Sequence, residues 1–434
     1  MRVVRYTDDD FAERLAEITS TSSLFDPLIE ERTKAIIEQV KSRGDDALFE
    51  LTEKFDRALL TPETLTVSAI ERFNASLAVP SGLRAAVAAA HKNIASFNKK
   101  ALRRNWSGHN SHGARVGEKF DPFQRVGIYI PGGTAPLVST ALMTVTLARV
   151  AGCQEIVVCS PCTETGALNP GLIFALNAAG ATEVYKLGGA QAIAAMALGT
   201  KTIRPVQKIF GPGNAYVVAA KRLLFGHVAV DLLPGPSEVL VLADDSANPS
   251  FVTADLLAQA EHGSGHERVW LITPSTRLVR AVEKEIPRQI KRLSRADYIA
   301  RALDANGRIL VVKSIDQGVE ITNRLAPEHC EIMCKGAGKI AERITTAGAI
   351  FLGNFSPTVL GDYVAGPSHE LPTGGAGRAF AGLTADQFQR RTSVVEYQAG
   401  SLKRAVAAVD EFARIEGLDA HGRSATIRLE KGKR

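Results

Sequence analysis

The chain has 434 residues, of which 45% are hydrophobic and 23% are charged, as in ordinary soluble globular proteins. This length is enough for a large core divided between two domains. The formal charge of +6 is scattered among acidic residues rather than gathered into a basic stripe. It therefore argues against a nucleic-acid partner and suits an anionic cofactor equally well.

Targeting signals and disulfide frameworks are not expected. Residues 1–15 carry acids where a signal peptide needs an apolar core, and the apolar segment 137–151 is too short to span a membrane. These features predict a cytoplasmic protein with no membrane partner. Five cysteines in so long a chain are interpreted as reduced, although Cys159 and Cys162 have the spacing of a redox or zinc pair.

The first part of the chain is predicted to be helical. Apolar residues recur at helical spacing over 27–55, and the pattern returns over 83–102. These helices are expected to cover a sheet. The histidines at 91, 109 and 112 are interpreted as surface residues.

From residue 126, strand patterns alternate with helical patterns, which predicts parallel βαβ units. The expected strands cover 126–130, 155–159, 183–187 and 206–210. Glycine-rich turns follow in this block, at 131–134, 188–191 and 211–214. Such turns let backbone N–H groups approach a pyrophosphate. None matches the G-x-G-x-x-G fingerprint, so the pattern alone does not separate NAD from a sugar phosphate or a mononucleotide.

The stretch 228–262 combines two strand patterns with a helix. A break at Pro234-Gly-Pro-Ser237 precedes an apolar strand over 239–243, and the helix that follows ends in Gln259-Ala-Glu-His262. Gln259 and His262 share one helix face, so an amide oxygen and an imidazole can converge as half of a metal site. Alone, such a pair is more often a capped or solvated helix end. His266 is set aside because Gly263-Ser-Gly265 would end the helix.

Further strands at 269–273, 308–312 and 331–333 alternate with helices, so a second α/β region repeats the plan. The predicted fold class is α/β, with two incomplete, doubly wound Rossmann-like domains, one inserted in the other. We expect the chain to divide into four parts: an N-terminal arm (1–25), a discontinuous first α/β domain (26–125 and 237–380), a second α/β domain (126–236) and a C-terminal helical tail (381–434).

Three other polar clusters carry possible chemistry. Glu328 and His329 are adjacent and can act as two proton acceptors at one site. Asp362 lies in Gly-Asp-Tyr, seven residues before His369. Glu416-Gly-Leu-Asp-Ala-His421 follows a helical pattern over 404–415. Each cluster also has an ordinary explanation, as a salt-bridging acid, a turn residue or a glycine-capped helix end.

Taken together, these motifs resemble the histidinol dehydrogenase family. The resemblance runs from about residue 27 to the C-terminus and rests on six runs of sequence. They are Asp231-Leu-Leu-Pro-Gly-Pro-Ser-Glu238 with Ala258-Gln-Ala-Glu-His262, Pro327-Glu-His329, Gly361-Asp-Tyr363, Gly366-Pro-Ser-His369 and Glu416-Gly-Leu-Asp-Ala-His421.

The resemblance implies a zinc-containing, NAD-dependent enzyme that oxidises L-histidinol through L-histidinal to L-histidine, the last steps of histidine biosynthesis. It implies one Zn²⁺ per subunit, and an amide, two imidazoles and a carboxylate suit that ion. The implied metal ligands are Gln259, His262, Asp362 and His421. Glu328 and His329 are the implied catalytic bases, and Tyr129, Gln191 and Asn214 are the implied NAD contacts. Substrate contacts are expected from Ser237, His329, Glu416 and the four metal ligands, with His369 as a further candidate.

In the resembling family the C-terminal tail crosses to a second subunit, which implies a homodimer with shared active sites. Two alternatives stay open. The chain could be a related zinc and NAD dehydrogenase of another small alcohol or diol. It could also be a non-catalytic nucleotide- or anion-binding protein that uses its glycine turns alone.

Overall fold

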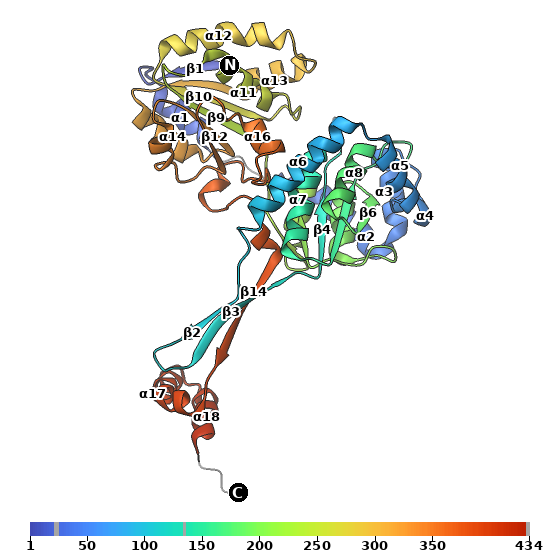
Figure 1. Ribbon diagram of the computed structural model, residues 1–434, viewed down its shortest axis with the longest axis vertical. Coiled ribbons are helices and arrows are strands. Elements are labelled where there is room, and N and C mark those ends of the chain that lie inside the picture. Colours follow the sequence, from blue (N-terminus) through green and yellow to red (C-terminus); the bar gives the residue numbers. More distant parts are fainter. Residues whose placement is uncertain (21–25, 133–135, 431–434) are drawn as a thin grey trace.

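The computed structural model describes residues 1–20, 26–132 and 136–430. They form two α/β domains and an arm that projects away from both (Figure 1). Within these ranges, no helix is long and apolar enough to cross a membrane.

A six-stranded parallel sheet forms the centre of one domain. The first strand of the chain lies at one edge of this sheet. The chain later re-enters the sheet in its middle, proceeds strand by strand toward that edge, and then returns to fill the other side. The order across the described strands is β1 (Arg2–Arg5), β11 (Gly307–Val311), β10 (Arg268–Thr273), β9 (Glu238–Ala243), β12 (His329–Met333) and β13 (Ala349–Leu352). Strand order therefore reverses between β9 and β12, as it does in a doubly wound fold.

A five-stranded parallel sheet forms the centre of the other domain. Its described strands lie in the order β6 (Glu183–Lys186), β5 (Glu155–Ser160), β4 (Arg125–Tyr129), β7 (Lys208–Phe210) and β8 (Ala229–Val230). The order reverses between β4 and β7. Two sheets of this kind confirm the expected α/β, doubly wound class.

Helices cover both faces of the five-stranded sheet. One face carries α5 (Ala69–Ala78), α6 (Ser81–Asn98), α7 (Val138–Ala151) and α8 (Pro170–Ala179), whose apolar residues share one core with β4 and β5. The other face carries α2 (Pro27–Arg43), α3 (Asp45–Asp56), α9 (Gly189–Leu198) and α10 (Ala215–Leu224). The short helix α4 (Pro62–Leu65) joins α3 to α5.

This packing differs from the expected division of the chain at two places. Residues 27–98 were expected on the discontinuous domain, but Leu48 packs with Ile193, and Ile94 packs with Met143. Residues 1–25 were expected as a separate arm, but β1 pairs with β11 as the edge strand of the six-stranded sheet. Helical periodicity identifies a buried face, and it does not specify which sheet that face covers.

The helices of the six-stranded domain begin where the sequence supplies caps. Asn248 accepts a hydrogen bond from the Ser250 N–H, and Pro249 occupies the first turn of α11 (Pro249–Ala260). The sequence predicts that this helix reaches His262, but α11 ends at Ala260 with Glu261 as its C-cap. Gly263 and Gly265 have positive φ just beyond that end, so the helix does not continue to His266. The other helices are α1 (Phe11–Ile18), α12 (Thr276–Ile290), α13 (Ala296–Asn306), α14 (Ile315–Leu325), α15 (Ala337–Ala341) and α16 (Thr358–Tyr363).

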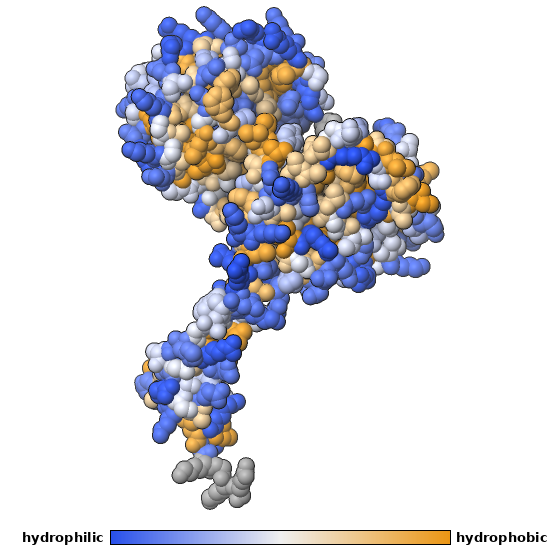
Figure 2. Space-filling model, in the orientation of Figure 1, coloured by the Kyte–Doolittle hydropathy of each residue, from blue (hydrophilic) through white to orange (hydrophobic). Residues whose placement is uncertain are grey.

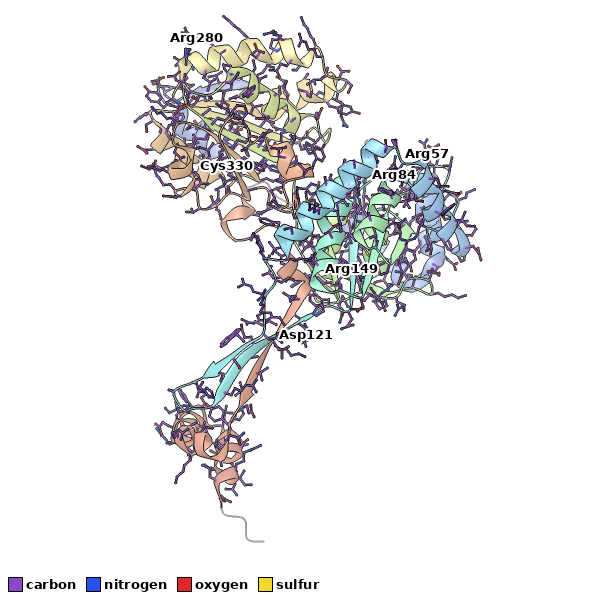
Figure 3. The ribbon with its side chains drawn as sticks, viewed as in Figure 1. Arg57, Arg84, Asp121, Arg149, Arg280 and Cys330 are labelled. Atoms are coloured by element: carbon purple, nitrogen blue, oxygen red, sulfur yellow. The ribbon has the colours of Figure 1, made fainter. Side chains whose placement is uncertain are left out.

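The arm is built on an antiparallel sheet that the sequence patterns did not predict. It consists of β14 (Gln389–Glu396), β3 (Arg115–Pro122) and β2 (Trp106–His109), and β14 pairs with β3 along its whole length. Asp121 lies where the arm leaves the globular part (Figure 3). The far end carries α17 (Ala399–Glu416) and α18 (Asp419–Thr426) (Figure 1). Short 3₁₀ helices are η1 (Ala376–Arg378), η2 (Ala385–Phe388) and η3 (Ile427–Leu429).

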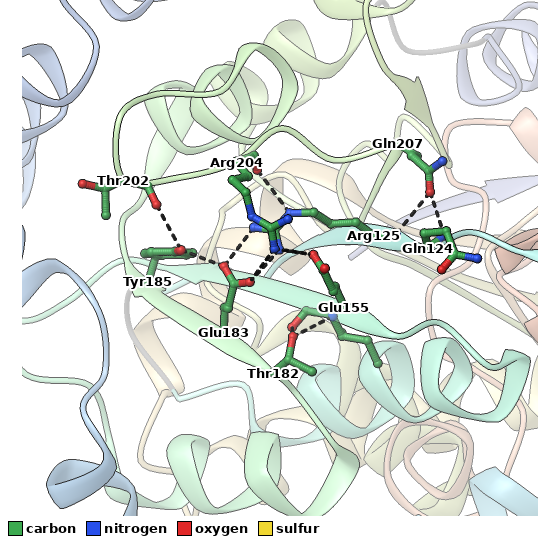
Figure 4. A network of polar contacts seen from close by, with 10 residues as sticks. Gln124, Arg125, Glu155, Thr182, Glu183, Tyr185, Thr202, Arg204 and Gln207 are labelled. Atoms are coloured by element: carbon green, nitrogen blue, oxygen red, sulfur yellow. Dashed lines mark hydrogen bonds and ion pairs between the residues drawn. The ribbon is translucent and has the colours of Figure 1, made fainter.

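An ion-pair network joins the amino ends of β4, β5 and β6 (Figure 4). The Arg125 guanidinium contacts Glu155 at 2.6 Å and holds both carboxylate oxygens of Glu183. The Tyr185 hydroxyl donates to Glu183 at 2.7 Å, and Arg204 contacts Glu155 at 2.7 Å. This network lies at the opposite edge of the sheet from the glycine turns, so its role is structural.

The cysteines are free thiols in the structure, as the sequence analysis expected. Cys330 lies inside the six-stranded sheet (Figure 3). Burial raises the pKa of Cys159 and Cys162, which makes both thiols poor nucleophiles and weakens the redox interpretation of this pair.

Candidate active site

The expected catalytic residues lie at the amino ends of the two strands where the order of the six-stranded sheet reverses. Glu238 begins β9, His329 begins β12, and Glu328 directly precedes β12. Ligands of open α/β sheets usually bind beyond the carboxyl ends of the strands. The expected residues lie instead at the amino edge. The segment after α16 docks on the other domain, where Asn98 donates to the Gly366 carbonyl at 3.1 Å and Ser368 donates to the Met143 carbonyl at 3.1 Å.

Glu328 and His329 are both anchored on the backbone of Glu238. The Glu328 carboxylate accepts a hydrogen bond from the Glu238 N–H at 2.7 Å. His329 Nδ1 lies 3.0 Å from the Glu238 carbonyl oxygen and donates to it, because a carbonyl can only accept. This bond leaves His329 Nε2 as the nitrogen that can exchange a proton, and Nε2 lies 3.5 Å from Asp362 Oδ1.

Burial and charge shift the pKa values of these three groups. Burial raises the pKa of Glu328 to about 8. Burial alone would lower the pKa of His329, but the carboxylates of Glu328 and Asp362 outweigh it and raise that pKa to about 9. Burial alone would raise the pKa of Asp362, but the hydrogen bond and charge of His329 hold it below its usual value. The site therefore keeps Asp362 ionised and gives its neighbours pKa values near the range in which proton transfer is useful.

Three of the four expected metal ligands lie near one another. Gln259 occupies the last turn of α11, His262 follows that helix, and Asp362 belongs to α16, which packs against α11. His262 Nδ1 lies 3.0 Å from the Gln259 carbonyl oxygen and donates to it, so Nε2 is the nitrogen left to bind a ligand. The Gln259 amide is 3% exposed, and among the described residues its Nε2 atom has no hydrogen-bond partner. An amide, an imidazole and a carboxylate fit a borderline cation such as Zn²⁺.

The fourth expected ligand lies elsewhere in this chain. His421 belongs to α18 and Glu416 ends α17, and both helices sit at the far end of the arm (Figure 1). Accordingly, the described ranges contain no cluster of three histidine, cysteine, aspartate or glutamate side chains that could hold a metal. The antiparallel sheet that carries α17 and α18 outward is the reason for this separation.

The expected NAD contacts lie at the carboxyl edge of the five-stranded sheet. Tyr129 ends β4, but its ring is 3% exposed and its hydroxyl accepts from the Gly189 N–H at 3.0 Å, so it holds the glycine turn. The Asn214 side chain caps α10 by accepting from the Tyr216 and Val217 N–H groups. Gln191 is 1% exposed, and its Oε1 has no partner in the described chain. Residues 133–134 of the first glycine turn lie outside the described residues.

The remaining predicted contacts flank the Glu–His pair. Ser237 directly precedes β9, and its carbonyl accepts from the Arg268 N–H at 3.0 Å. His369 lies between the two domains, with Nε2 3.1 Å from Thr140 Oγ1 of α7 and Nδ1 3.1 Å from the Asp362 carbonyl oxygen.

The sequence reasoning missed a buried ion pair that supports the glycine turn after β7. Lys221 of α10 contacts the Asp231 carboxylate and donates to the Gly211 carbonyl at 2.9 Å, and Asp231 Oδ2 accepts from the Gly211 N–H at 2.7 Å. The signal was present, because an aspartate follows an otherwise apolar strand pattern at 228–230. It also missed Asp255 and Glu331, an acidic pair behind the candidate metal ligands.

Two doubly wound domains and a buried acid–imidazole pair are typical of an α/β enzyme. The histidinol dehydrogenase family model matches residues 20–429. A relative from Geobacillus kaustophilus is 44% identical and covers 93% of this chain and 95% of its own length. One from Heliobacterium mobile is 40% identical over 99% of this chain and 100% of its own. Both are named histidinol dehydrogenase.

The solved structure of histidinol dehydrogenase from Elizabethkingia anophelis is also similar. It covers 99% of this chain and 98% of its own, with 35% identity and a TM-score of 0.94. The chain therefore belongs to the histidinol dehydrogenase family. It is an oxidoreductase that oxidises histidinol in histidine biosynthesis.

Proposed function

We propose that the enzyme is zinc- and NAD-dependent and carries out both oxidations, from L-histidinol to L-histidinal and from L-histidinal to L-histidine. The observation that carries this proposal is the buried pair formed by Glu328 and His329, whose free imidazole nitrogen lies 3.5 Å from the Asp362 carboxylate. Removal of a hydroxyl proton requires a base, and here the candidate base lies next to a candidate cation ligand.

For the first oxidation we assign His329 as the base. Its Nδ1 bond to the Glu238 carbonyl holds the ring with Nε2 toward the site. Nε2 would accept the hydroxyl proton, and NAD⁺, when bound, would supply the acceptor for the hydride that leaves the carbinol carbon, so that an aldehyde results. Zinc bound by Gln259, His262, Asp362 and the partner subunit's His421 would supply positive charge that favours the alkoxide and offsets the charge that raises the His329 pKa.

For the second oxidation we assign Glu328 as the group that activates water. It would remove a proton from water as the oxygen adds to the aldehyde carbon, and the tetrahedral alkoxide that forms would become the carboxylic acid on loss of a hydride, for which a second NAD⁺ would be the acceptor. Burial supports this role, because it raises the pKa of Glu328 to about 8 and so makes the carboxylate a stronger base than an exposed one.

NAD binding is proposed at the carboxyl edge of the five-stranded sheet, with Tyr129, Gln191 and Asn214. Support comes from the reversal of strand order between β4 and β7, which is where doubly wound sheets bind nucleotides. The buried amide oxygen of Gln191 lacks a hydrogen-bond partner among the described groups, so a bound ligand could supply one.

A homodimer with shared active sites is proposed because one chain holds three of the four donors. The arm supports this arrangement, since it exposes apolar side chains that a monomer would leave in water, and Figure 2 shows apolar surface near its end. The exposed apolar residues of the arm include Val394, Val395, Phe412, Ile415 and Leu418. In such a dimer Glu416 and His421 would approach the partner's Glu–His pair, and Glu416 would contact the substrate together with Ser237 and His369.

The test follows NADH absorbance with L-histidinol as the limiting substrate, with and without a chelator. We expect two NADH per histidinol and loss of turnover in the chelator that added Zn²⁺ restores. One NADH per substrate would limit the enzyme to an alcohol dehydrogenase. No NADH from histidinol, with turnover on another amino alcohol or diol, would refute the substrate.

A further inference from the structure

A pair of buried carboxyl groups lies behind the candidate active site. Asp255 of α11 is 8% exposed and Glu331 of β12 is 1% exposed, and the two side chains are in hydrogen-bonding contact. Two ionised carboxylates in such contact would repel strongly at low dielectric constant. The contact is therefore stable when one of the two groups carries a proton and donates it to the other.

The pKa shifts agree with this contact. Burial raises the pKa of Asp255 to about 6 and that of Glu331 to about 9, and the charge of Asp255 adds to the rise at Glu331. The charge of His329 opposes the rise without offsetting it. Near neutral pH the pair therefore holds one shared proton, and Glu331 Oε2 has no other partner in the described chain.

Glu331 also fixes the start of α16. Its Oε1 accepts from the Thr358 N–H at 2.7 Å, and Thr358 is the first residue of that helix. The residue at the N-cap position is Pro357, which has no side-chain acceptor. Glu331 thus supplies from a distant strand the cap that the local sequence lacks.

The acid pair connects the three elements that carry the candidate site. Asp255 lies one helical turn before Gln259 on α11, and Glu331 lies two residues after His329 on the same face of β12. The helix capped by Glu331 carries Asp362. A shift of any one element would move a metal ligand or the base relative to the others.

We propose that Asp255 and Glu331 form an acid pair sharing one proton, and that this pair positions α11, β12 and α16 so that Gln259, Asp362 and His329 meet. Both are positioning residues, because they act through the groups they hold. The inference rests on the proposed zinc site and extends it to a supporting layer that orients its ligands. Supporting groups of this kind typically change metal affinity or activity by about 10–100-fold when they are removed.

The experiment uses the zinc-loaded, full-length enzyme and measures the rate of zinc loss to a chelator, together with Tm. Glu331→Leu removes both the cap and the shared proton, and we expect zinc loss at least about tenfold faster than in the wild type. Glu331→Gln keeps an oxygen for the Thr358 N–H and an N–H for the Asp255 carboxylate. Zinc retention should therefore return to within about threefold of the wild type.

Two further variants separate positioning from stability. Ile332→Ala opens a cavity on the opposite face of the same strand, so it lowers Tm without touching the pair. Thr358→Pro removes the capped N–H together with the buried Thr358 hydroxyl, but it suits the backbone, because proline is favoured at the first helical position and Pro357 already has the extended backbone that must precede a proline. We expect Thr358→Pro to speed zinc loss and Ile332→Ala to leave it unchanged. If Glu331→Leu does not fold, the comparison of Thr358→Pro with Ile332→Ala tests the inference instead.

The inference is overturned if the rate of zinc loss in the four variants depends only on how far Tm is lowered. It is also overturned if Glu331→Gln loses zinc as fast as Glu331→Leu. The proposed function fails separately if the wild type binds no zinc and forms no NADH with histidinol, and the inference then falls with it. A zinc-binding, active wild type with unaltered zinc loss in both Glu331→Leu and Thr358→Pro would refute the positioning role alone.

Discussion

His329 Nε2 lies 3.5 Å from Asp362 Oδ1, although the two residues come from a strand and a helix that are 33 positions apart in the chain. This contact joins a candidate proton acceptor to a candidate metal ligand. Mutation can distinguish the two roles, because Asp362 is expected to hold the cation and His329 is not.

Replacing His329 tests the proton-transfer role. His329→Asn keeps a hydrogen-bonding side chain of similar size but removes the base, so we expect kcat to fall by about 10²–10⁴-fold. Zinc content, measured by metal analysis of the purified variant, should stay near that of the wild type. His262→Asn is the matched control, since it should lose zinc. Parallel loss of zinc and turnover in His329→Asn would contradict the assignment.

Mixing two inactive variants tests the shared site. His262→Asn and His421→Asn each disable one part of the proposed donor set, but a mixed dimer contains one site with both histidines intact. After unfolding and refolding together in equal amounts, the mixture should recover up to about a quarter of wild-type activity, because random pairing makes about half of the dimers mixed and each mixed dimer has one intact site of two. Refolding each variant alone provides the baseline. No recovery in the mixture would argue that each chain builds its own site.

Removing one member of the Lys221–Asp231 pair should be strongly destabilising. Asp231→Asn leaves a fully buried ammonium group without its counter-ion, which costs about 3–5 kcal/mol of unfolding free energy. Lys221→Met combined with Asp231→Asn should cost less than the sum of the single changes, because no unpaired charge is left. Urea unfolding measures both effects. Additive losses would show that the two groups act independently.

The same pair should affect NAD through the Gly211 turn. Asp231 accepts from the Gly211 N–H, and Lys221 donates to the Gly211 carbonyl, so loss of Asp231 frees the turn that follows β7. We expect the KM for NAD to rise more than the KM for histidinol in Asp231→Asn. Equal changes in both KM values would indicate a general loss of structure.

The Arg125 network should contribute to stability at neutral pH and lose that contribution in acid. Hydrogen bonds from Arg125 lower the pKa of Glu183 below its ordinary value of 4.5. A carboxyl whose folded-state pKa is lowered stabilises the protein fully above the unfolded-state pKa, and this contribution disappears as pH falls through the folded-state pKa. The Tm difference between wild type and Glu183→Gln should therefore be largest near pH 7 and shrink below about pH 4.5. A Tm difference that stays constant over this range would contradict the role of the Arg125–Glu183 hydrogen bonds.

The local sequence predicts much of this fold because local patterns carry the required information. The strand–helix alternation from residue 126 predicts β4 to β7 and their parallel pairing, and the Gly263 and Gly265 pair predicts the end of α11. The arm is different. β14 is mostly exposed and β3 is mostly half-buried, and neither strand shows a clean alternation of buried residues. Pairing between segments about 270 residues apart therefore left no periodic signal.

The candidate site divides in the same way. Glu328 and His329 are adjacent in the chain, and Gln259 and His262 share a helix end, so the sequence by itself determined these pairs and their chemistry. Only the tertiary structure decided that Asp362 lies beside His329, that Glu331 caps the helix bearing Asp362, and that His421 is carried away on the arm. The physical reason is that side-chain spacing along one helix or strand is fixed by backbone geometry, whereas the approach of separate elements depends on which buried surfaces pack together.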